Sequence, residues 1–312
     1  MSRAVAASLY RIAERHPRRD AWAKARAARM WGCGDYLQFA DVVNQETGEV
    51  TRKLQAAEFC RDRLCPMCQW RKSLVTFSQV SEIMDRIDAD RAGLVPIFLT
   101  LTVRNCGGDA LEATVKHLLK SWSRMMNKAG RRRPWRVALG WFRALEVTYN
   151  AAADEWHPHI HAIVLVAPDY FADESKYIDH DGWVAEWRWA LGADYDPSVD
   201  VRTVKGARAH AVAEVSKYAV KPGDWLDRSD DDATDGRVRL LAQVLKGTRL
   251  VAFGGLMKDV RAALRQEDAD AADLVHTGDD AAVRGDLTVA IERFEWQIGV
   301  TNYVSTGRRN VM

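Results

Sequence analysis

Three histidines stand at alternate positions in the string WHPHIHAIVLV, which spans residues 156–166. The apolar run that follows them is typical of a strand, and alternate residues of a strand share one face. His157, His159 and His161 are therefore expected to point the same way. Two imidazoles one residue apart on a rigid strand are a ready pair of metal ligands, and a hard divalent ion also takes an oxygen ligand.

Glu146 is the predicted oxygen ligand. It lies in WFRALEVTY (141–149), a second predicted strand that a short polar connection joins to the first. With the turn centred at 152–153, Glu146 stands opposite His159, and directly opposed residues share a face. We expect Glu146, His159 and His161 to surround one ion and to leave open positions for a substrate. The alternative is that the histidines are hydrogen-bonded core residues.

A second chemical signal is the run AEVSKYAVK, which ends at Lys221. Glu214 and Tyr218 are four residues apart and share a helix face, and Lys217 and Lys221 form a second such pair. A Tyr hydroxyl beside a metal ion and a Lys could attack phosphorus and form a covalent intermediate. A carboxylate one turn away could later activate water. By itself this signal is weak, because a helical Tyr usually packs in the core or lies on the surface, and either Lys could belong to a solvated face.

Four of the five cysteines fall early in the chain: Cys33 in WGCGD, and Cys60, Cys65 and Cys68 in CRDRLCPMC. The N-terminus lacks the continuous apolar region of a signal peptide, so we expect a cytoplasmic protein. There, CxxC spacing favours a metal site over a disulfide. Four soft ligands suit a closed, structural Zn²⁺ site with no catalytic position. A redox pair and unliganded buried thiols are the alternatives, and Cys106 stands outside the set.

The elements that must position these residues can be read from apolar periodicity. Strands are predicted over 96–105, 141–149, 159–166 and 199–204, and helices from residue 111 to about 126 and over 207–220. One short hairpin and this order of elements indicate an α+β fold with an antiparallel sheet.

Three ordered motifs resemble those of the single-tyrosine rolling-circle replication initiators of small bacterial plasmids, a branch of the HUH endonuclease superfamily. FLTLTVRN (98–105) is similar to the family's first motif. HPHIH (157–161) is similar to its metal motif, and EVSKYAVK (214–221) to its nucleophile motif. The segments CRDRLCPMCQWRKS (60–73) and RLVAFGGLMKDV (249–260) also look like parts of the family.

The resemblance implies an HUH-type nuclease domain with both metal-binding histidines on the central strand of an antiparallel sheet and Tyr218 on a flanking helix. It implies Mg²⁺ or Mn²⁺ binding, nicking of one strand at the plasmid's double-strand origin, a 5′-phosphotyrosine and a free 3′-OH primer. Glu214 occupies the position associated with hydrolytic termination. The third metal ligand varies across the superfamily, so the choice of Glu146 depends on the hairpin geometry as much as on the resemblance. His157 is left as a residue that supports the ligands or contacts the substrate.

Charge is unevenly distributed along the 312 residues, although the net charge is only +2. Residues 1–72 carry 14 Lys and Arg against 8 Asp and Glu, whereas 267–280 is acidic. A basic front and an acidic tail fit a protein that meets DNA with one part only. Candidate phosphate contacts are the basic stripe from Lys116 to Arg133 and the Arg-rich N-terminus. Trp70, Trp122 and Trp135 could stack on bases, although Trp122 lies on the apolar side of its helix.

Three blocks are expected: a basic N-terminal region with the four-cysteine zinc site (1–85), the endonuclease domain (86–262) and an acidic segment with a strand-like tail of unknown role (263–312). No apolar run approaches the roughly 18 residues of a membrane helix. No P-loop occurs, so we expect a host helicase and DNA polymerase as partners, with single-stranded or hairpin origin DNA as the substrate. A homodimer is compatible with this interpretation.

Two alternatives stay open. Another HUH enzyme, a single-strand transposase or a relaxase, would use similar chemistry, although relaxases usually place the Tyr before the His motif. A non-catalytic, zinc-containing DNA-binding repressor would bind DNA without forming a covalent adduct.

Overall fold

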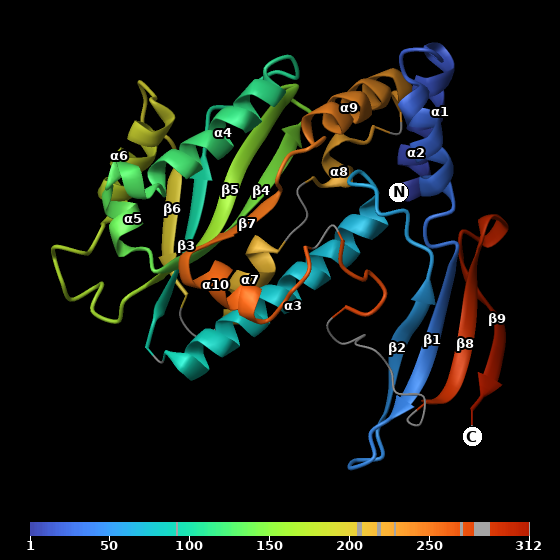
Figure 1. Cartoon of the computed structure of the whole chain (residues 1–312). Helices are drawn as coiled ribbons and strands as arrows, with labels where there is room; N and C mark the ends of the chain where they lie inside the picture. The colour runs from blue at the N-terminus through green and yellow to red at the C-terminus, as the bar shows by residue number, and fades with distance from the viewer. Residues whose placement is uncertain are drawn as a thin grey trace. The chain divides into compact units, whose positions relative to one another are not determined.

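The computed structural model describes residues 1–91, 93–204, 208–216, 220–227, 229–268, 271–277 and 288–311. Their contacts divide the chain into two compact units, one of residues 1–78 with 267–312 and the other of residues 79–266. Each unit holds one antiparallel sheet together with helices (Figure 1). The prediction of an α+β fold with an antiparallel sheet is therefore confirmed.

The sheet of the second unit has the strand order β6-β3-β5-β4-β7, and all its neighbouring strands are antiparallel. The strand that carries the histidines is thus central, as the resemblance implied. Its strands are β3 (Val95–Thr102), β4 (Gly140–Asn150), β5 (Glu155–Val166), β6 (Val199–Thr203) and β7 (Val251–Gly254).

Helices surround this sheet. They are α4 (Leu111–Met125), the 3-10 turn η1 (Lys128–Gly130), α5 (Arg133–Val137), α6 (His180–Leu191), α7 (Arg208–Val215), α8 (Pro222–Trp225), α9 (Asp231–Val244) and α10 (Gly255–Ala263). Helix α4 buries the apolar stripe that its sequence predicts, and its Trp122 ring lies 5.2 Å from that of Trp141 on β4. Trp141 and Glu146 lie on opposite faces of β4 because they are five residues apart. The core under α4 is therefore separated from the face that carries the predicted metal ligands.

The hairpin of β4 and β5 has the predicted register. Glu146 pairs with His159, and the connection is a four-residue turn over residues 151–154. The Tyr149 hydroxyl donates to Asp154 Oδ1 at 2.6 Å, and Asp154 takes a left-handed φ of 52° that closes the turn. This turn fixes the register, and the register fixes which side chains share a face.

The predicted helix over 207–220 is shorter in the structure. Helix α7 ends at Val215, and Val220 forms a parallel bridge with Val147 of β4 instead of extending the helix. The bridge requires extended backbone at Val220, which is incompatible with a helix that continues to this residue. Lys217 and Tyr218 lie outside the described residues.

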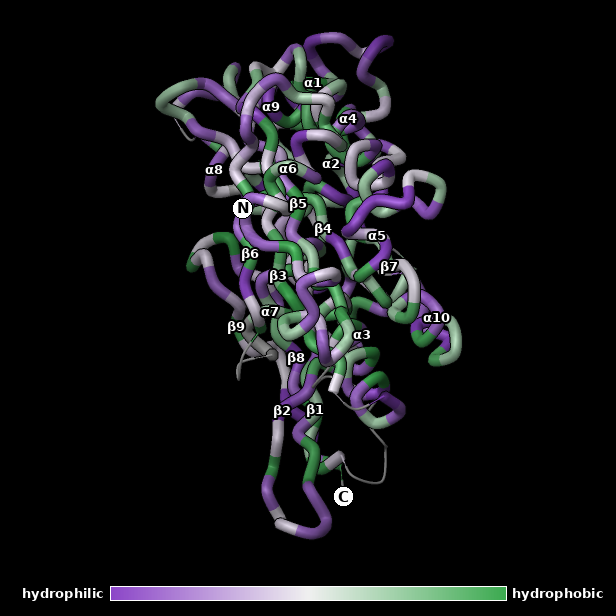
Figure 2. The backbone as a smooth tube through the Cα atoms, turned by 90° about the vertical axis from the view of Figure 1, so that its left-hand side faces the viewer, coloured by the Kyte–Doolittle hydropathy of each residue, from purple (hydrophilic) through white to green (hydrophobic). Residues whose placement is uncertain are grey.

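The first unit contains α1 (Ser2–Arg15), α2 (Ala21–Trp31), β1 (Tyr36–Val43), β2 (Val50–Ala57), β8 (Thr288–Gln297), the 3-10 turn η4 (Ile298–Val300) and β9 (Asn302–Asn310). Helix α3 (Pro66–Asp90) includes the boundary between the two units. The sheet order is β2-β1-β8-β9, so the C-terminal strands complete a sheet that the N-terminal hairpin begins. The connection between β1 and β2 is hydrophilic (Figure 2).

One buried carboxylate connects all four strands of this sheet. Asp41 on β1 accepts from Arg52 on β2 at 2.8 and 3.2 Å and from Arg308 on β9 at 3.0 Å. Arg52 also pairs with Glu292 on β8 at 2.9 Å. The guanidinium groups of Arg52 and Arg308 hold the pKa of Asp41 below its ordinary value. The network stabilises the closure of the chain's two ends into one sheet.

Among the described residues, no helix combines the length and the apolar character needed to cross a bilayer.

The Asp41→Asn variant tests this network. We expect a loss of about 1–3 kcal/mol of stability, because two arginines lose a charged partner. A lowered folded-state pKa stabilises the protein above the unfolded pKa of about 3.9, and this contribution is lost as pH falls through the folded pKa. Thermal unfolding at several pH values should therefore show a weaker acid dependence below about pH 4 in the variant. The exposed Glu46→Gln on the β1–β2 turn serves as a control, and equal behaviour of both variants would contradict this role.

Candidate metal centres and active site

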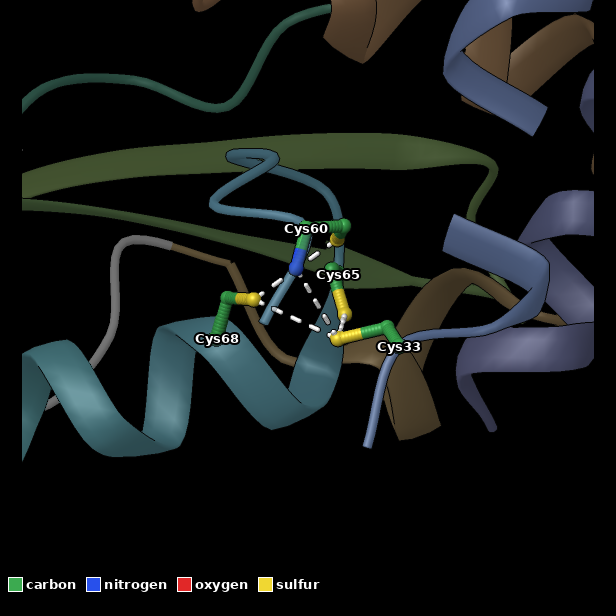
Figure 3. Close-up of side chains that lie close together, drawn as sticks. All are labelled: Cys33, Cys60, Cys65 and Cys68. Carbon is green, nitrogen blue, oxygen red and sulfur yellow. Dashed lines mark hydrogen bonds between the residues drawn. The ribbon is translucent and has the colours of Figure 1, made fainter. Parts of the chain in front are cut away.

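The four predicted cysteine ligands meet in the first unit, although they come from three separate segments. Cys33 follows α2, Cys60 follows β2, and Cys65 and Cys68 flank the start of α3 (Figure 3). Pro66 occupies the first helical position, where its missing N–H costs no helical hydrogen bond. The first turn of α3 therefore presents Cys65 and Cys68 as a pair.

Sulfur–sulfur distances identify the kind of site. Cys33 lies 3.5 Å from both Cys65 and Cys68, and Cys60 lies 3.6 Å from Cys68. These distances are far above the roughly 2.05 Å of a disulfide. They are near the edge of a tetrahedron with metal–sulfur bonds of about 2.3 Å. The donor set fits Zn²⁺ in a closed structural site.

Backbone groups and the titration of the thiols support this fit. The amide of Cys60 donates to Cys33 Sγ at 3.4 Å, and that of Arg61 to Cys68 Sγ at 3.2 Å. Hydrogen bonds from the other three thiols lower the pKa of Cys65, whereas hydrogen bonding within the cluster raises the pKa of Cys60 and of Cys68. Four thiolates therefore need a cation to coexist, and a metal ion supplies that charge.

Two arginines beside this cluster hold the start of the acidic segment. Arg61 donates to the carbonyl of Ala271 at 3.0 Å, and Arg71 donates to those of Leu274 and Val275, each at 2.7 Å. The contacts involve backbone carbonyls rather than carboxylates. Residues 271–277 of the acidic segment therefore pack against the region of the cysteine cluster.

The second cluster lies on β4 and β5, in the second unit. Glu146, His159 and His161 are all buried, and their ligand atoms lie within 4.8 Å of one another. The Nε2 atoms of His159 and His161 are 3.2 and 3.0 Å from the same oxygen, Glu146 Oε2. The structure thus brings together the three ligands predicted from the hairpin.

The far side of each imidazole is also held. His161 Nδ1 lies 3.1 Å from Thr100 Oγ1 on β3, and His159 Nδ1 lies 3.1 Å from the carbonyl of His157. Such contacts fix the ring orientation and direct the other nitrogen toward an ion. Thr100 lies in the FLTLTVRN motif, but the sequence did not predict its contact with His161, because that pairing joins strands that are distant along the chain.

Lys221 completes the surroundings of the carboxylate. Its Nζ lies 2.6 Å from Glu146 Oε1. Burial by itself would raise the pKa of Glu146, but contacts with His159, His161 and Lys221 outweigh burial and hold it well below the ordinary range. Burial would lower the pKa of Lys221, yet its contact with Glu146 raises it above the ordinary value. Glu146 and Lys221 are therefore both charged at neutral pH. Glu146 Oε2 and the two imidazole nitrogens that contact it remain as ligand atoms for a divalent ion.

Lys221, on the C-terminal flank of Tyr218, reaches this face, and Glu214 on the other flank acts on Lys221 through its charge. On the C-terminal side, Lys221 pairs with Glu146. On the N-terminal side, the charge of Glu214 acts on both Lys221 and Arg202. Arg202 lies 5.8 Å from the Phe98 ring, which itself lies 5.7 Å from that of His161. Arg202 is thus a cation near the histidine face that the sequence did not reveal.

The remaining predicted DNA contacts are the three tryptophans and the basic stripe from Lys116 to Arg133. Trp122 is 1% exposed and belongs to the core, whereas Trp70 is 48% exposed and Trp135 is half-buried. In the basic stripe, Lys116 pairs with Glu112 at 2.5 Å, whereas Arg124 and Arg132 lie 4.2 and 4.3 Å from the Trp189 ring. Arg132 also pairs with the buried Glu186 at 2.7 Å, so both ends of the stripe contain paired cations.

Fold and clusters together define an α+β protein with two groups of side chains that fit metal ions. The family model for the Rep_1 replication proteins matches residues 51–304. The chain is 34% identical to "Protein rep" of Streptococcus pneumoniae serotype 2, over 88% of this chain and 82% of that protein. It is 31% identical to "Protein rep" of Lactiplantibacillus plantarum, over 89% and 87% of the two chains.

The chain therefore belongs to the Rep_1 family of replication proteins, and the resemblance to plasmid replication initiators stated from its motifs is confirmed. No solved structure matches the chain.

Elemental analysis of the purified protein tests the cysteine cluster. We expect about one zinc per chain, lost in Cys65→Ser together with thermal stability, because structural zinc sites contribute folding energy. Cys106→Ser is the matched control and should keep the zinc. Retention of zinc in Cys65→Ser would contradict the assignment.

Titration with Mn²⁺ tests the second cluster. His161→Ala should lower the affinity at least 10-fold, because it removes a ligand atom. His157→Ala should change it by less than about 3-fold, because the contact with His159 uses the backbone carbonyl of residue 157, which the substitution keeps. Equal losses in both variants would reject this ligand set.

Proposed function

We propose that this protein is a plasmid rolling-circle replication initiator that nicks one DNA strand at the plasmid's double-strand origin. The observation that carries the proposal is the convergence of Glu146, His159 and His161 on the face that Lys221, three residues after Tyr218, also reaches. Membership in a replication protein family gives this arrangement its context.

Glu146, His159 and His161 would hold Mg²⁺ or Mn²⁺. Such an ion polarises a phosphodiester and stabilises the negative charge that develops on its oxygens. One carboxylate with two imidazoles suits a divalent ion that keeps open positions for a substrate. His157 supports the set through its carbonyl.

In the proposed reaction, the hydroxyl oxygen of Tyr218 attacks the scissile phosphorus. The bond between phosphorus and the 3′ oxygen breaks, the phenol loses its proton, and the 3′ oxygen gains one. The products are a 5′-phosphotyrosine and a free 3′-OH, so the energy of the phosphodiester bond is conserved. Lys217 or Lys221 would lower the pKa of the phenol, which starts near 10, or hold a phosphate oxygen.

Glu214 would act at termination. A carboxylate near the phosphotyrosine can take a proton from water, and the resulting hydrolysis releases the protein without a second tyrosine. The effect of its charge on Lys221 and Arg202 supports this role.

The other parts of the proposal concern support and partners. The cysteine cluster would hold structural Zn²⁺ and stabilise the first unit. Single-stranded or hairpin origin DNA would be the substrate, and the basic residues at α5 would contact its phosphates. A host helicase and DNA polymerase would separate the strands and extend the 3′-OH in the cytoplasm, and a homodimer at the origin fits this scheme.

A covalent-adduct assay with labelled single-stranded origin DNA and Mn²⁺ tests the division of roles. Tyr218→Phe should lose nicking by at least 10³-fold while DNA binding stays within about 2-fold, because only the nucleophilic oxygen is removed. Glu214→Ala should still nick, but it should accumulate adduct. Tyr177→Phe, on an exposed loop, is the matched control.

Equal loss of nicking in Tyr218→Phe and Glu214→Ala would reject this division of roles. DNA binding without any metal-dependent nick would favour the DNA-binding repressor. Transfer of strands between the ends of a mobile element would favour the transposase.

A further inference from the structure

The end of β3 is irregular where it passes the histidine face. Thr102 pairs with His159, and Cys106 pairs with Trp156, so the three residues 103–105 lie opposite only the two residues 157 and 158. One extra residue on one strand is a β-bulge, a device that redirects side chains and is frequent beside active sites. The redirected residues are Arg104 and Asn105, the last two of the FLTLTVRN motif, for which the proposed chemistry gives no role.

Asn105 is held against the histidine row. Its Oδ1 lies 2.6 Å from His157 Nδ1, and its amide donates to Glu155 Oε2 at 3.1 Å. The imidazole rings of His157 and His159 are 5.0 Å apart, and those of His159 and His161 are 4.8 Å apart. The bulge therefore stands at the outer end of a continuous row that begins at the metal ligands.

Arg104 lies next to a tyrosine at this end. Its backbone amide donates to the Tyr195 hydroxyl at 3.1 Å, and its guanidinium carbon is 3.9 Å from the centre of the Tyr195 ring. The Arg104 side chain is nevertheless 66% exposed. Its ionic partner, Asp194, is 3.7 Å away and 89% exposed, so that pair is weak. The guanidinium thus has a fixed position and an accessible side.

The loop that carries Tyr195 is itself held by β3. Helix α6 ends at Gly192, whose φ of 65° turns the chain toward this loop. The Trp187 indole donates to the carbonyl of Thr102 at 2.7 Å, and the Thr102 hydroxyl donates to the carbonyl of Ser198 at 2.9 Å. Helix α6 before the loop and Ser198 at its end are therefore both bound to Thr102, two residues before Arg104, so the Arg104–Tyr195 pair is preformed.

We propose that Arg104 and Tyr195 form a subsite for one base of the single strand, adjacent to the scissile phosphate. This inference rests on the proposed nicking function, and it gives the FLTLTVRN motif a role in holding the substrate. A guanidinium held on an aromatic ring offers a flat, positively charged surface on which any base can stack, and such stacking contributes affinity without strong sequence preference. Asn105 is a positioning residue that fixes the bulge against His157.

The test uses the full-length protein and origin oligonucleotides with the fluorescent base 2-aminopurine at each nucleotide on either side of the nick. Stacking quenches this base. The wild-type protein should quench one position, and Arg104→Ala and Tyr195→Ala should each abolish that quenching. In nicking assays, both variants should raise KM about 10-fold and leave kcat within about 3-fold, because a stacked base is bound equally in the ground and transition states.

Three further variants separate the subsite from general charge and from folding. Tyr195→Phe keeps the ring and should stay within about 3-fold of the wild-type KM. The double variant Arg104→Ala/Tyr195→Ala should be no more than about 2-fold worse than either single variant, because the two residues act as one unit. Arg188→Ala removes a cation that pairs with Asp196 of the same loop at 2.8 Å, and its KM should change less than about 2-fold.

The outcomes distinguish the two proposals. If the wild type nicks and Arg104→Ala nicks with an unchanged KM and quenching pattern, the subsite is wrong and the nuclease stands. If Arg188→Ala weakens the substrate as much as Arg104→Ala, charge alone acts and the subsite is again wrong. If the wild type forms no nick with any divalent ion, the proposed function fails, and the subsite fails with it.

Discussion

A buried carboxylate is the constraint on which the second unit depends. Glu146 is 4% exposed in the middle of a sheet, where an uncompensated charge would cost several kcal/mol. Its two oxygens face different partners: Oε2 faces both imidazoles, and Oε1 faces the ammonium of Lys221. That compensation requires the hairpin register, the central place of β5 and the return of the chain to β4 after α7. Glu146, His159 and His161 could also hold a metal ion, so the structural requirement and the proposed chemistry use the same atoms.

The first unit contains two comparable clusters, one around the buried carboxylate of Asp41 and one formed by four cysteines. Asp41 is compensated by arginines from the two outer strands, and this closes the N- and C-terminal strands into one sheet. The four cysteines bring a loop, a helix start and the end of α2 together, and the neighbouring Arg61 and Arg71 hold the carbonyls of residues 271–275. A metal ion held by the cysteines and the docking of residues 271–275 would therefore stabilise the same region.

Local patterns in the sequence predicted much of this. The hairpin register could be predicted because a tight turn fixes the pairing of its own strands. Glu146 and His159 are equally far from the centre of that turn in sequence, so they stand opposite each other. The apolar spacing of α4 predicted both the helix and the burial of Trp122. The CxxC spacing likewise anticipated a cluster in which Cys33 is the distant fourth member.

Contacts between distant segments could not be read in this way. The pairing of β8 with β1 spans most of the chain, and no local signal links Asp41 to Arg308. Thr100 contacts His161 only because β3 pairs with β5. Tyr195 contacts Arg104 only because the loop after α6 lies beside the irregular residues 103–105 that follow β3. The predicted helix extended too far, because its composition is helical while Val220 pairs with Val147 of β4. The predicted roles of Tyr218 and Lys217 concern residues outside the described part of the chain.

Mass spectrometry of the protein–DNA adduct tests the central claim most directly. The adduct would be formed with Mn²⁺, digested with a nuclease and trypsin, and the modified peptide sequenced. The account predicts a nucleotide joined through its 5′-phosphate to Tyr218. A phosphonucleotide on any other residue, or linkage through a 3′-phosphate, would contradict it.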